Sequence, residues 1–429
     1  MARRRIAENI VVAVITAIQV LACRLGFKQR SFAPGDAAAD AAPILVVRCE
    51  AKIGDNLLHI PFLRALRAMY LGRQIHLVHH ENARAIYEHC PFVDKRIEIS
   101  WPMSAPATLL RRLSLCAAVF KMLGSRTRYG LAIAPRWDED LYAPFIAWMS
   151  GAPRVIGFSR HVLREKAWRN YGTDCLFTDA VLDTAVRHES QRALRLLACL
   201  PNAHVAPAAG LEFWFSEDDQ RKVKLLQDVA APSGVTWIAM APGAAIDRRK
   251  WPVANFASVA QALGQRPGVR LMLLGTAAEA VDCETLLQAS RPSASLNLAG
   301  RLSLAQTAAA LQACRMFIGN DSGLLHLASA VRTPVIEISC HPMQSPDLHA
   351  NSPARFGPTA PISAVLRPAR PLTQACRHGC IFGTAHCITA VTAASVVHTA
   401  ESLLDAELSD LSAEHLSLPK LTVEEDVRT

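Results

Sequence analysis

The chain has 429 residues, of which 51% are hydrophobic and 19% charged, so it has enough apolar material for two globular domains and is neither disordered nor fibrous. Lysine and arginine outnumber aspartate and glutamate by 46 to 37, a net charge of +9 that favours anionic ligands such as phosphorylated sugars, acidic lipid headgroups or nucleic acid. The sequence contains no RNP-like, zinc-finger or helix-turn-helix pattern, so we expect no nucleic-acid partner.

The first thirty residues contain an apolar run between basic residues. The run extends from Ile10 to Cys23, with three arginines before it and three basic residues behind it. At about 14 residues it is shorter than the roughly 20 that span a bilayer. We favour a helix that lies on the anionic surface of the inner leaflet. A signal peptide, a lipoprotein cleavage site at "VLAC", a packed amphipathic helix and a misassigned start are the alternatives.

Regular patterning begins after "PGDAAADAAP", which we predict to be a linker that closes an N-terminal segment of residues 1–42. Short apolar runs typical of buried parallel strands then alternate with amphipathic helical runs. The predicted strands are "ILVVRC", "QIHLVHH", "YGLAIAP" and "RVIGFS", and the predicted helices are "LLHIPFLRALRAMY" and residues 109–123. This alternation predicts a doubly wound α/β domain over residues 43–205.

Prolines and alanines interrupt the pattern after residue 200, followed by a predicted edge strand in "LEFWF" and a charged helix. We place the domain boundary here, with a second domain at 206–406 and an acidic tail at 407–429. Its predicted strands are "VTWIAMAPG", "VRLMLLG", "RMFIGN" and "PVIEIS", and its helices include "ANFASVAQALG", "SLAQTAAALQAC", "GLLHLASAV" and a last one over 392–404. Two such domains in series leave a cleft, and ligands bind in the loops that follow strands.

Three strand-to-helix loops carry candidate site residues. In the first, "RCEAKIGDNLLHIP", Asp55 either caps the following helix or projects into the cleft as a general base. In the second, "APGAAIDRRKWPVANF", small residues let backbone amides approach a ligand, and residues 248–250 add positive charge. Amides and cations together suit a diphosphate, although a solvated basic loop has the same composition.

The third loop, "FIGNDSGLLHLA", combines an acid, a hydroxyl, a glycine and a histidine. We expect a helix whose first amides lie at residues 322–324 and attract phosphate oxygens, with Gly323 leaving room for their approach. His326 lies on the first turn, where it can reach the same ligand. Because the charge of Asp321 repels phosphate, this residue is expected to cap the helix or to accept hydrogen bonds from sugar hydroxyls.

Cysteine spacing bears on compartment and metal binding. The 12 cysteines form no dense framework, which predicts free thiols in a reducing compartment, the cytoplasm. Near the C-terminus Cys376, Cys380 and Cys387, with His378 and His386, have a composition that can hold zinc. Their spacing is not the paired C-x2-C type, so we favour buried structural thiols and predict no metal site.

These loops, in this order, resemble glycosyltransferase family 9, the heptosyltransferases that build the inner core of lipopolysaccharide. The resemblance is carried by "IGDNLLHIPFLRALR", "APGAAIDRRKWPVANFASVAQAL" and "LAGRLSLAQTAAALQACRMFIGNDSGLLHLASAVRTPVIEIS", and it extends from Ile44 to Ala400 with the closing "CRHGCIFGTAHCITAVTAASV". It implies the GT-B architecture of two Rossmann-like domains facing a cleft, no cofactor or metal, and inversion of the anomeric centre.

The resemblance also assigns site residues. It implies that Asp55 is the catalytic base, and it places Arg249 where the family has a phosphate-binding lysine two residues before the tryptophan. Lys250 is at a variable position, so either cation can hold the diphosphate. Ala244 and Ala245 replace small hydroxylated residues and leave only backbone contacts. The remaining implied donor-binding residues are Glu279 (sugar or ribose), Leu302 (packing on the base), Asp321, Ser322, Gly323 and His326.

The implied activity is transfer of a sugar, most simply heptose from ADP-heptose, to a lipopolysaccharide core or related lipid-linked glycan at the inner face of the cytoplasmic membrane. Two alternatives stay open: a sugar-nucleotide epimerase or hydrolase on the same plan, and a non-catalytic protein that binds a glycan or nucleotide. We do not expect an oxidoreductase, since neither half has G-x-G-x-x-G after its first strand.

Overall fold

The computed structural model describes residue 32 and residues 37–100, 127–140, 142–201, 210–230, 234–290 and 295–405. The predicted N-terminal helix, the predicted helix at 109–123 and the acidic tail lie outside these ranges. Within them, none of the helices has the length and apolar character needed to cross a bilayer. The chain divides into two compact units, Met1–Ala185 with Ser190–Ala208, and Val186–Glu189 with Ala209–Thr429.

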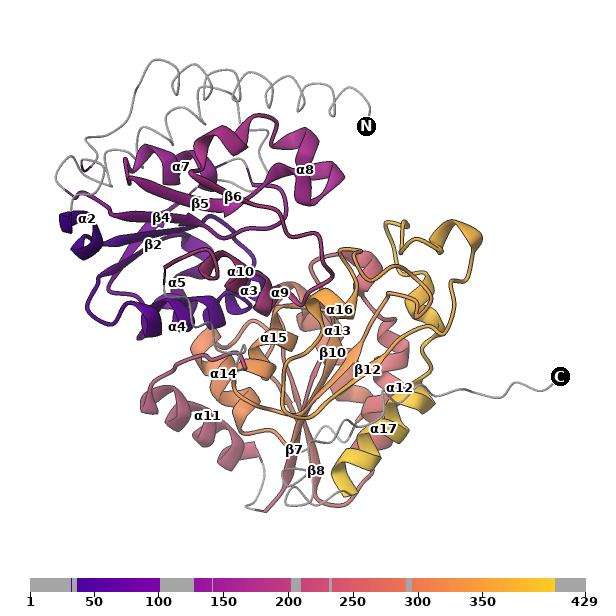
Figure 1. Ribbon diagram of the computed structural model, residues 1–429. Helices are drawn as coiled ribbons and strands as arrows, with labels where there is room; N and C mark the ends of the chain where they lie inside the picture. Colours follow the sequence, from indigo (N-terminus) through magenta and orange to yellow (C-terminus); the bar gives the residue numbers. More distant parts are fainter. Residues whose placement is uncertain are drawn as a thin grey trace. The chain divides into compact units, whose positions relative to one another are not determined.

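The first unit contains a parallel sheet with helices on both faces (Figure 1). Its strands are β1 (Ile44–Arg48), β2 (Ile75–His80), β3 (Lys95–Ile99), β4 (Leu131–Ala134), β5 (Arg154–Phe158) and β6 (Asp179–Val181). Its helices are α2 (Ala37–Ala41), α3 (Ile53–Leu57), α4 (Ile60–Met69), α5 (Arg84–Tyr87), α7 (Ala143–Met149), α8 (Arg164–Arg169) and α10 (Leu194–Leu197), with 3-10 turns η1 (Glu81–Ala83), η2 (Arg160–Val162) and η3 (Thr173–Leu176). Helix α9 (Glu189–Arg192) straddles the division between the units.

The strand order of this sheet is β3-β2-β1-β4-β5-β6, the order of the dinucleotide-binding Rossmann fold. β1 is buried along nearly its whole length because it pairs with β2 on one side and β4 on the other. Its apolar residues therefore contact helices on both faces, which explains the continuous hydrophobic run in the sequence. The chain changes direction between β1 and β4, and the loops after these two strands flank this switch point.

Two local predictions for the first unit were wrong. The helix predicted over residues 57–70 begins only at Ile60, as α4, and the unpredicted α3 ends at Leu57, because Pro61 has no N–H to continue the ladder and its ring would clash with the carbonyl of Leu57. The predicted linker contains α2, as its alanines have the highest helix propensity. Arg73 holds this helix by donating from Nε to the Ala42 carbonyl at 2.8 Å.

The second unit repeats the plan. Its strands are β7 (Thr236–Ala241), β8 (Val269–Leu273), β9 (Leu296–Asn297), β10 (Met316–Asn320), β11 (Val335–Ile338) and β12 (Ser363–Leu366). Its helices are α11 (Glu217–Ala230), α12 (Val253–Gly264), α13 (Ala280–Ala289), α14 (Leu304–Gln312), α15 (Gly323–Ala330), α16 (Pro353–Phe356) and α17 (Ala393–Asp405), with 3-10 turns η4 (Asp247–Arg249), η5 (Ala277–Glu279), η6 (Gln374–Cys376) and η7 (Cys387–Ala390).

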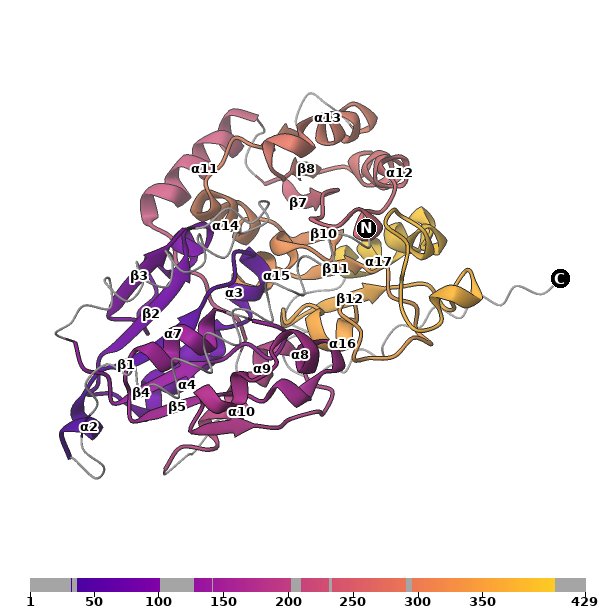
Figure 2. The same ribbon diagram turned by 90° about the horizontal axis from the view of Figure 1, so that it is seen from above.

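The second sheet has the order β12-β11-β10-β7-β8-β9 and is parallel throughout. Counted from its own first strand, this is the same Rossmann order, with the switch point between β7 and β10. Helices α12 and α17 cover one face, and α11 and α14 cover the other (Figures 1 and 2). Trp251 and Phe256 pack edge to face at 5.0 Å in the core of the unit. The prediction of doubly wound α/β units is therefore confirmed in both halves.

The edge strand predicted in "LEFWF" is absent from the described part of the chain. Leu211 and Phe213 are buried, as the alternating pattern predicts, but residues 210–216 are not assigned to any strand of the two described sheets. Alternation reports which side chains face the core, whereas a strand also requires a neighbouring ladder of backbone hydrogen bonds.

Candidate active site

The predicted donor-binding residues all follow four neighbouring strands of the second sheet. Ala244, Ala245, Arg249 and Lys250 follow β7, Glu279 follows β8, Leu302 follows β9, and Asp321 to His326 follow β10. Since parallel strands end at the same edge of a sheet, these loops share one edge. The loops after β7 and β10 flank the switch point, which is where doubly wound sheets bind their ligands.

Asn320, the last residue of β10, joins these two loops. Its side chain is fully buried; Oδ1 accepts from the Trp251 amide at 3.1 Å, and Nδ2 donates to the Pro242 carbonyl at 2.7 Å. One amide therefore fixes both ends of the loop after β7 against the end of β10. The sequence prediction did not include Asn320, and the only signal for it was its position at the end of a buried strand.

Arg249 forms the main ion pair of this edge. Its Nη1 lies 2.9 Å from Asp321 Oδ2, and both side chains are largely buried. Nε and Nη2 donate to Asn351 Oδ1 at 3.0 and 2.9 Å, and Nη2 also donates to the Ala350 carbonyl. The guanidinium is thus held by protein acceptors on three sides. Asp321 neither caps α15, whose N-cap position is Ser322, nor stands unpaired.

Lys250 is held less firmly than Arg249. Its ammonium lies 2.9 Å from Asp247 Oδ1, and the two side chains are 43% and 68% exposed. Such a pair is worth little in stability, so the ammonium can exchange Asp247 for an anionic ligand at low cost. In the same loop Ala244 is buried and Ala245 is exposed.

Glu279 is both a cap and a neighbour of the loop after β7. Its carboxylate accepts from the Thr276 amide at 2.6 Å in a capping box that starts η5. A Cβ placed on Gly243 would lie 2.7 Å from the Glu279 side chain, so a larger residue here would displace the Glu279 carboxylate. Leu302 is half-buried directly before Ser303, whose side chain caps α14.

The N-terminus of α15 carries unsatisfied polar groups. Ser322 occupies the N-cap position, but its hydroxyl makes no capping bond, and its buried Oγ has no hydrogen-bond partner among the described residues. The same is true of the buried Nδ1 of His326. Burial, followed by the charges of His188 and Arg249, lowers the pKa of His326 to about 3, so the ring is neutral at neutral pH. Since buried polar groups without partners are costly, this terminus is suited to receive a polar ligand.

Glu337 lies in the middle of β11, between β10 and β12, and is almost completely buried. Its Oε2 has no hydrogen-bond partner in the described part of the chain. Burial, followed by the nearby charge of Asp321, raises the pKa of Glu337 from 4.5 to about 8. The side chain is therefore mainly protonated at neutral pH. It is a second acid beside the Arg249–Asp321 pair, and the sequence analysis did not identify it.

We predict that Glu337 makes the stability of the second unit depend on pH. Folding raises the pKa of Glu337, so the contribution of this residue to the free energy of unfolding is complete below about pH 4.5. The contribution declines by roughly 1.4 kcal/mol per pH unit as the pH rises to about 8. Glu337→Gln should flatten this decline, whereas Glu217→Gln, an exposed change in α11, should not. Urea unfolding at pH 5.5 and pH 8 measures the difference; equal slopes for wild type and Glu337→Gln would contradict the prediction.

In the first unit, Asp55 lies in the loop after β1. The N-cap of α3 is Lys52, so Asp55 stands inside the first turn and the interpretation of this residue as an N-cap was wrong. Its carboxylate is 18% exposed and lies 3.9 Å from the Lys52 ammonium, while its backbone carbonyl accepts from Arg48 Nη2 at 2.9 Å. An acid at this position is favoured by the helix dipole and is accessible to solvent.

Three further side chains of this switch point were missed by the sequence analysis. Glu50 forms a buried ion pair with Arg136, which follows β4, and it accepts from the Ala51 amide at 3.0 Å. His59 is fully buried, with both ring nitrogens unpaired within the described ranges, and burial lowers its pKa well below 6.5. The detectable signal for Glu50 and Arg136 was that each directly follows a predicted buried strand, whereas His59 had no such signal.

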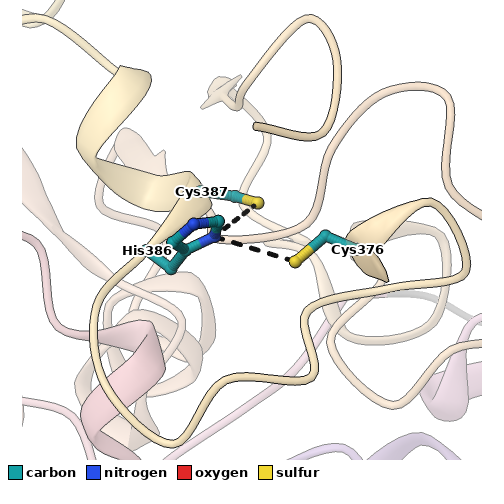
Figure 3. A group of neighbouring side chains, drawn as sticks. All are labelled: Cys376, His386 and Cys387. Carbon is teal, nitrogen blue, oxygen red and sulfur yellow. Dashed lines mark hydrogen bonds between the residues drawn. The ribbon is translucent and has the colours of Figure 1, made fainter. Parts of the chain in front are cut away.

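The C-terminal cysteines are buried and free, as predicted. Among the described residues, one group of side chains could hold a metal ion: Cys376, His386 and Cys387, whose ligand atoms all lie within 4.8 Å of one another (Figure 3). Two residues that the sequence placed with them lie outside this group: His378, which is exposed, and Cys380, which is buried.

Comparison with known proteins agrees with this geometry. The family model of glycosyltransferase family 9 (heptosyltransferase) matches residues 117–341. Lipooligosaccharide heptosyltransferase 2 of Haemophilus ducreyi is 24% identical over 308 residues, which cover 68% of this chain and 82% of that protein.

Solved structures agree on the fold. A family 9 glycosyl transferase from Veillonella parvula superposes with a TM-score of 0.68 and 20% identity over 85% of this chain and 97% of its own. The ADP-heptose lipopolysaccharide heptosyltransferase II of Escherichia coli superposes with a TM-score of 0.62 and 21% identity, over 86% of this chain and 99% of its own. This likeness confirms the predicted GT-B fold. Because the family model covers more than half of the sequence, the chain belongs to glycosyltransferase family 9 and is a glycosyltransferase.

Proposed function

We propose that this glycosyltransferase moves a heptose from ADP-heptose to the core of lipopolysaccharide or a related lipid-linked glycan. The observation that carries the proposal is the N-terminus of α15 at the switch point of the second sheet, where Ser322 Oγ and His326 Nδ1 are buried without partners in the described part of the chain. The heptosyltransferase 2 of Haemophilus ducreyi and the ADP-heptose enzyme of Escherichia coli support the choice of donor and acceptor.

The transfer step is a single displacement. The acceptor hydroxyl oxygen forms the new bond to the anomeric carbon, the bond from that carbon to the diphosphate oxygen breaks, and the configuration inverts. Asp55 takes the acceptor proton, and ADP leaves with the bonding electrons. The amides of Gly323 and Leu324 at the start of α15 and the Lys250 ammonium neutralise the charge that develops on the diphosphate. These groups take the role that a divalent cation has in other transferases.

The donor's other parts are assigned to the surrounding loops. We place the diphosphate between α15 and the loop after β7, the ribose or heptose hydroxyls against Asp321 and Glu279, and the base against Leu302. Arg249 is held by Asp321 and Asn351, so we assign it to positioning Asp321, and we assign direct phosphate contact to Lys250. Ala244 and Ala245 contribute backbone only.

We place the enzyme in the cytoplasm, with its lipid-linked acceptor at the inner face of the cytoplasmic membrane. The net charge of +9 and the basic residues around the apolar run at residues 10–23 support attraction to an anionic surface.

The test is incubation with a panel of nucleotide sugars and truncated lipopolysaccharide acceptors, with products identified by mass and anomeric configuration by NMR. We expect heptose transfer from ADP-heptose with inversion, and the same rate without added Mg²⁺. Release of free sugar alone would instead identify a hydrolase, and a rearranged nucleotide sugar would identify an epimerase. Donor binding without turnover would identify a binding protein.

Replacing Lys250 with alanine is expected to lower kcat about 100-fold, because one charge stabiliser of the leaving diphosphate is lost. Stability should change little, since the Lys250–Asp247 pair is exposed. Lys222→Ala is the matched control, because Lys222 also forms an exposed pair, with Asp218 in α11. Steady-state kinetics with ADP-heptose measure the effect; a change below about threefold would return the phosphate contact to Arg249.

A further inference from the structure

The segment between β12 and α17 has little regular structure of its own. Residues 367–392 contain the 3-10 turns η6 and η7 and otherwise consist of turns and irregular backbone. Loops of this length are uncommon in compact domains and usually serve a function. Yet Cys376, Cys380 and Cys387 within the segment are buried, and Ile388 and Val391 belong to the core of the second unit. Some interaction therefore has to hold the segment in place.

Two sulfurs point at the same nitrogen in this segment. His386 Nδ1 lies 3.7 Å from Cys376 Sγ and 3.4 Å from Cys387 Sγ (Figure 3). A ring nitrogen carries either one hydrogen or one lone pair, so it can serve one of these sulfurs at a time. A cation among the three atoms would satisfy all of them at once.

The separations fit a tetrahedral zinc ion. With Zn–S bonds of about 2.3 Å and Zn–N bonds of about 2.0 Å, a sulfur and a nitrogen on two corners of the tetrahedron lie about 3.5 Å apart. The observed 3.7 and 3.4 Å lie on either side of this value. A mixed set of sulfur and imidazole ligands also selects zinc over magnesium or calcium, which prefer oxygen.

We propose that Cys376, His386 and Cys387 bind one Zn²⁺ ion that holds the segment between β12 and α17 in place. Both thiols bind as thiolates and release their protons to solvent, and the imidazole binds through Nδ1 in its neutral form. Two thiolates balance the charge of the ion, which makes the site compatible with burial. Cys380, in the same segment, lies outside this group, and its thiol is hydrogen-bonded to that of Cys340.

The ion would support the loop that holds Arg249 without touching the donor. The Cys376 carbonyl accepts from Ser345 Oγ at 3.4 Å, and a Cβ on Gly379 would lie 2.3 Å from the His349 ring, so the segment packs against residues 345–349. This loop continues to Asn351, which accepts from Arg249. The role is structural, and it does not depend on which sugar is transferred.

The first test is the metal content of the full chain, purified with a reducing agent and without chelators. We expect about one zinc per chain by elemental analysis, and its loss in the double variant Cys376→Ala/Cys387→Ala. Cys314→Ala is the matched control, because Cys314 is equally buried but bonds to the Ala310 carbonyl in another part of the unit. The control should keep its zinc.

The second test needs no variant and therefore holds even if the double variant does not fold. X-ray absorption of the zinc-loaded wild type should show at least two sulfur neighbours at about 2.3 Å and one nitrogen at about 2.0 Å. A chelator should lower the melting temperature of the wild type. Each of four results would overturn the proposal. The first two are wild type that contains no zinc and takes up none after chelation, and a zinc site without sulfur neighbours. The other two are a disulfide between Cys376 and Cys387 detected by mass, and a double variant that retains the metal.

Discussion

Replacing Asp55 with asparagine is expected to lower kcat for sugar transfer by about 10²–10⁴-fold and to leave the affinity for ADP unchanged. Asparagine has nearly the same shape but cannot take the acceptor proton. Asp55 stands in the first turn of α3 with its carboxylate accessible and with one weak partner, Lys52, so its loss removes little structural support. Turnover with ADP-heptose and a lipopolysaccharide acceptor measures kcat, and calorimetry measures ADP affinity.

The matched control is Asp40→Asn, the same chemical change at an exposed position of α2. It should leave both quantities unchanged. An Asp55→Asn variant that keeps kcat within about threefold would remove the general base from the mechanism. An equal loss of ADP affinity would show that Asp55 acts on the donor and not on the acceptor.

Replacing Arg249 with methionine is expected to lower the free energy of unfolding by about 3–5 kcal/mol, because the buried Asp321 loses its partner. Transfer activity should fall with stability, because Asp321 would leave the position that we assign to donor hydroxyls. Chemical unfolding measures the first effect and KM for ADP-heptose the second.

A double variant separates a charge effect from lost packing. Arg249→Met with Asp321→Asn removes both charges, so it should be more stable than Arg249→Met alone. Arg301→Ala, an exposed arginine in the loop after β9, is the control and should change stability by less than about 0.5 kcal/mol. Additive losses in the double variant would contradict the role of Asp321.

The repeating fold was predictable because its signals are local. "ILVVRC" and "RMFIGN" became β1 and β10, since a strand buried on both faces requires a continuous apolar run. The split between α3 and α4 was also encoded locally, in Pro61, but the apolar periodicity that continues across it concealed the break. The prediction of an edge strand in "LEFWF" was wrong for a non-local reason, because a strand depends on a partner elsewhere in the chain.

The site was predictable only in outline. Glycine, small residues and charges after strands indicated the loops that we propose to bind the donor, yet they did not indicate which side chains pair with one another. The contact between Arg249 and Asp321 joins positions far apart in sequence, and Glu337 was read only as part of a buried strand. Such pairings are set by strand order, and the order cannot be obtained from the pattern of a single strand.

The bridging amide of Asn320 has a consequence for engineering this enzyme. The loops after β7 and β10 both depend on this one side chain, so an aspartate there would replace the hydrogen-bond donor toward the Pro242 carbonyl with an acceptor and disturb both loops together. Libraries aimed at new nucleotide sugars should therefore keep residue 320 constant. Variation is better directed to Ala244, Ala245 and Leu302, which we propose to face the donor and whose side chains can change while the hydrogen bonds of Asn320 are kept.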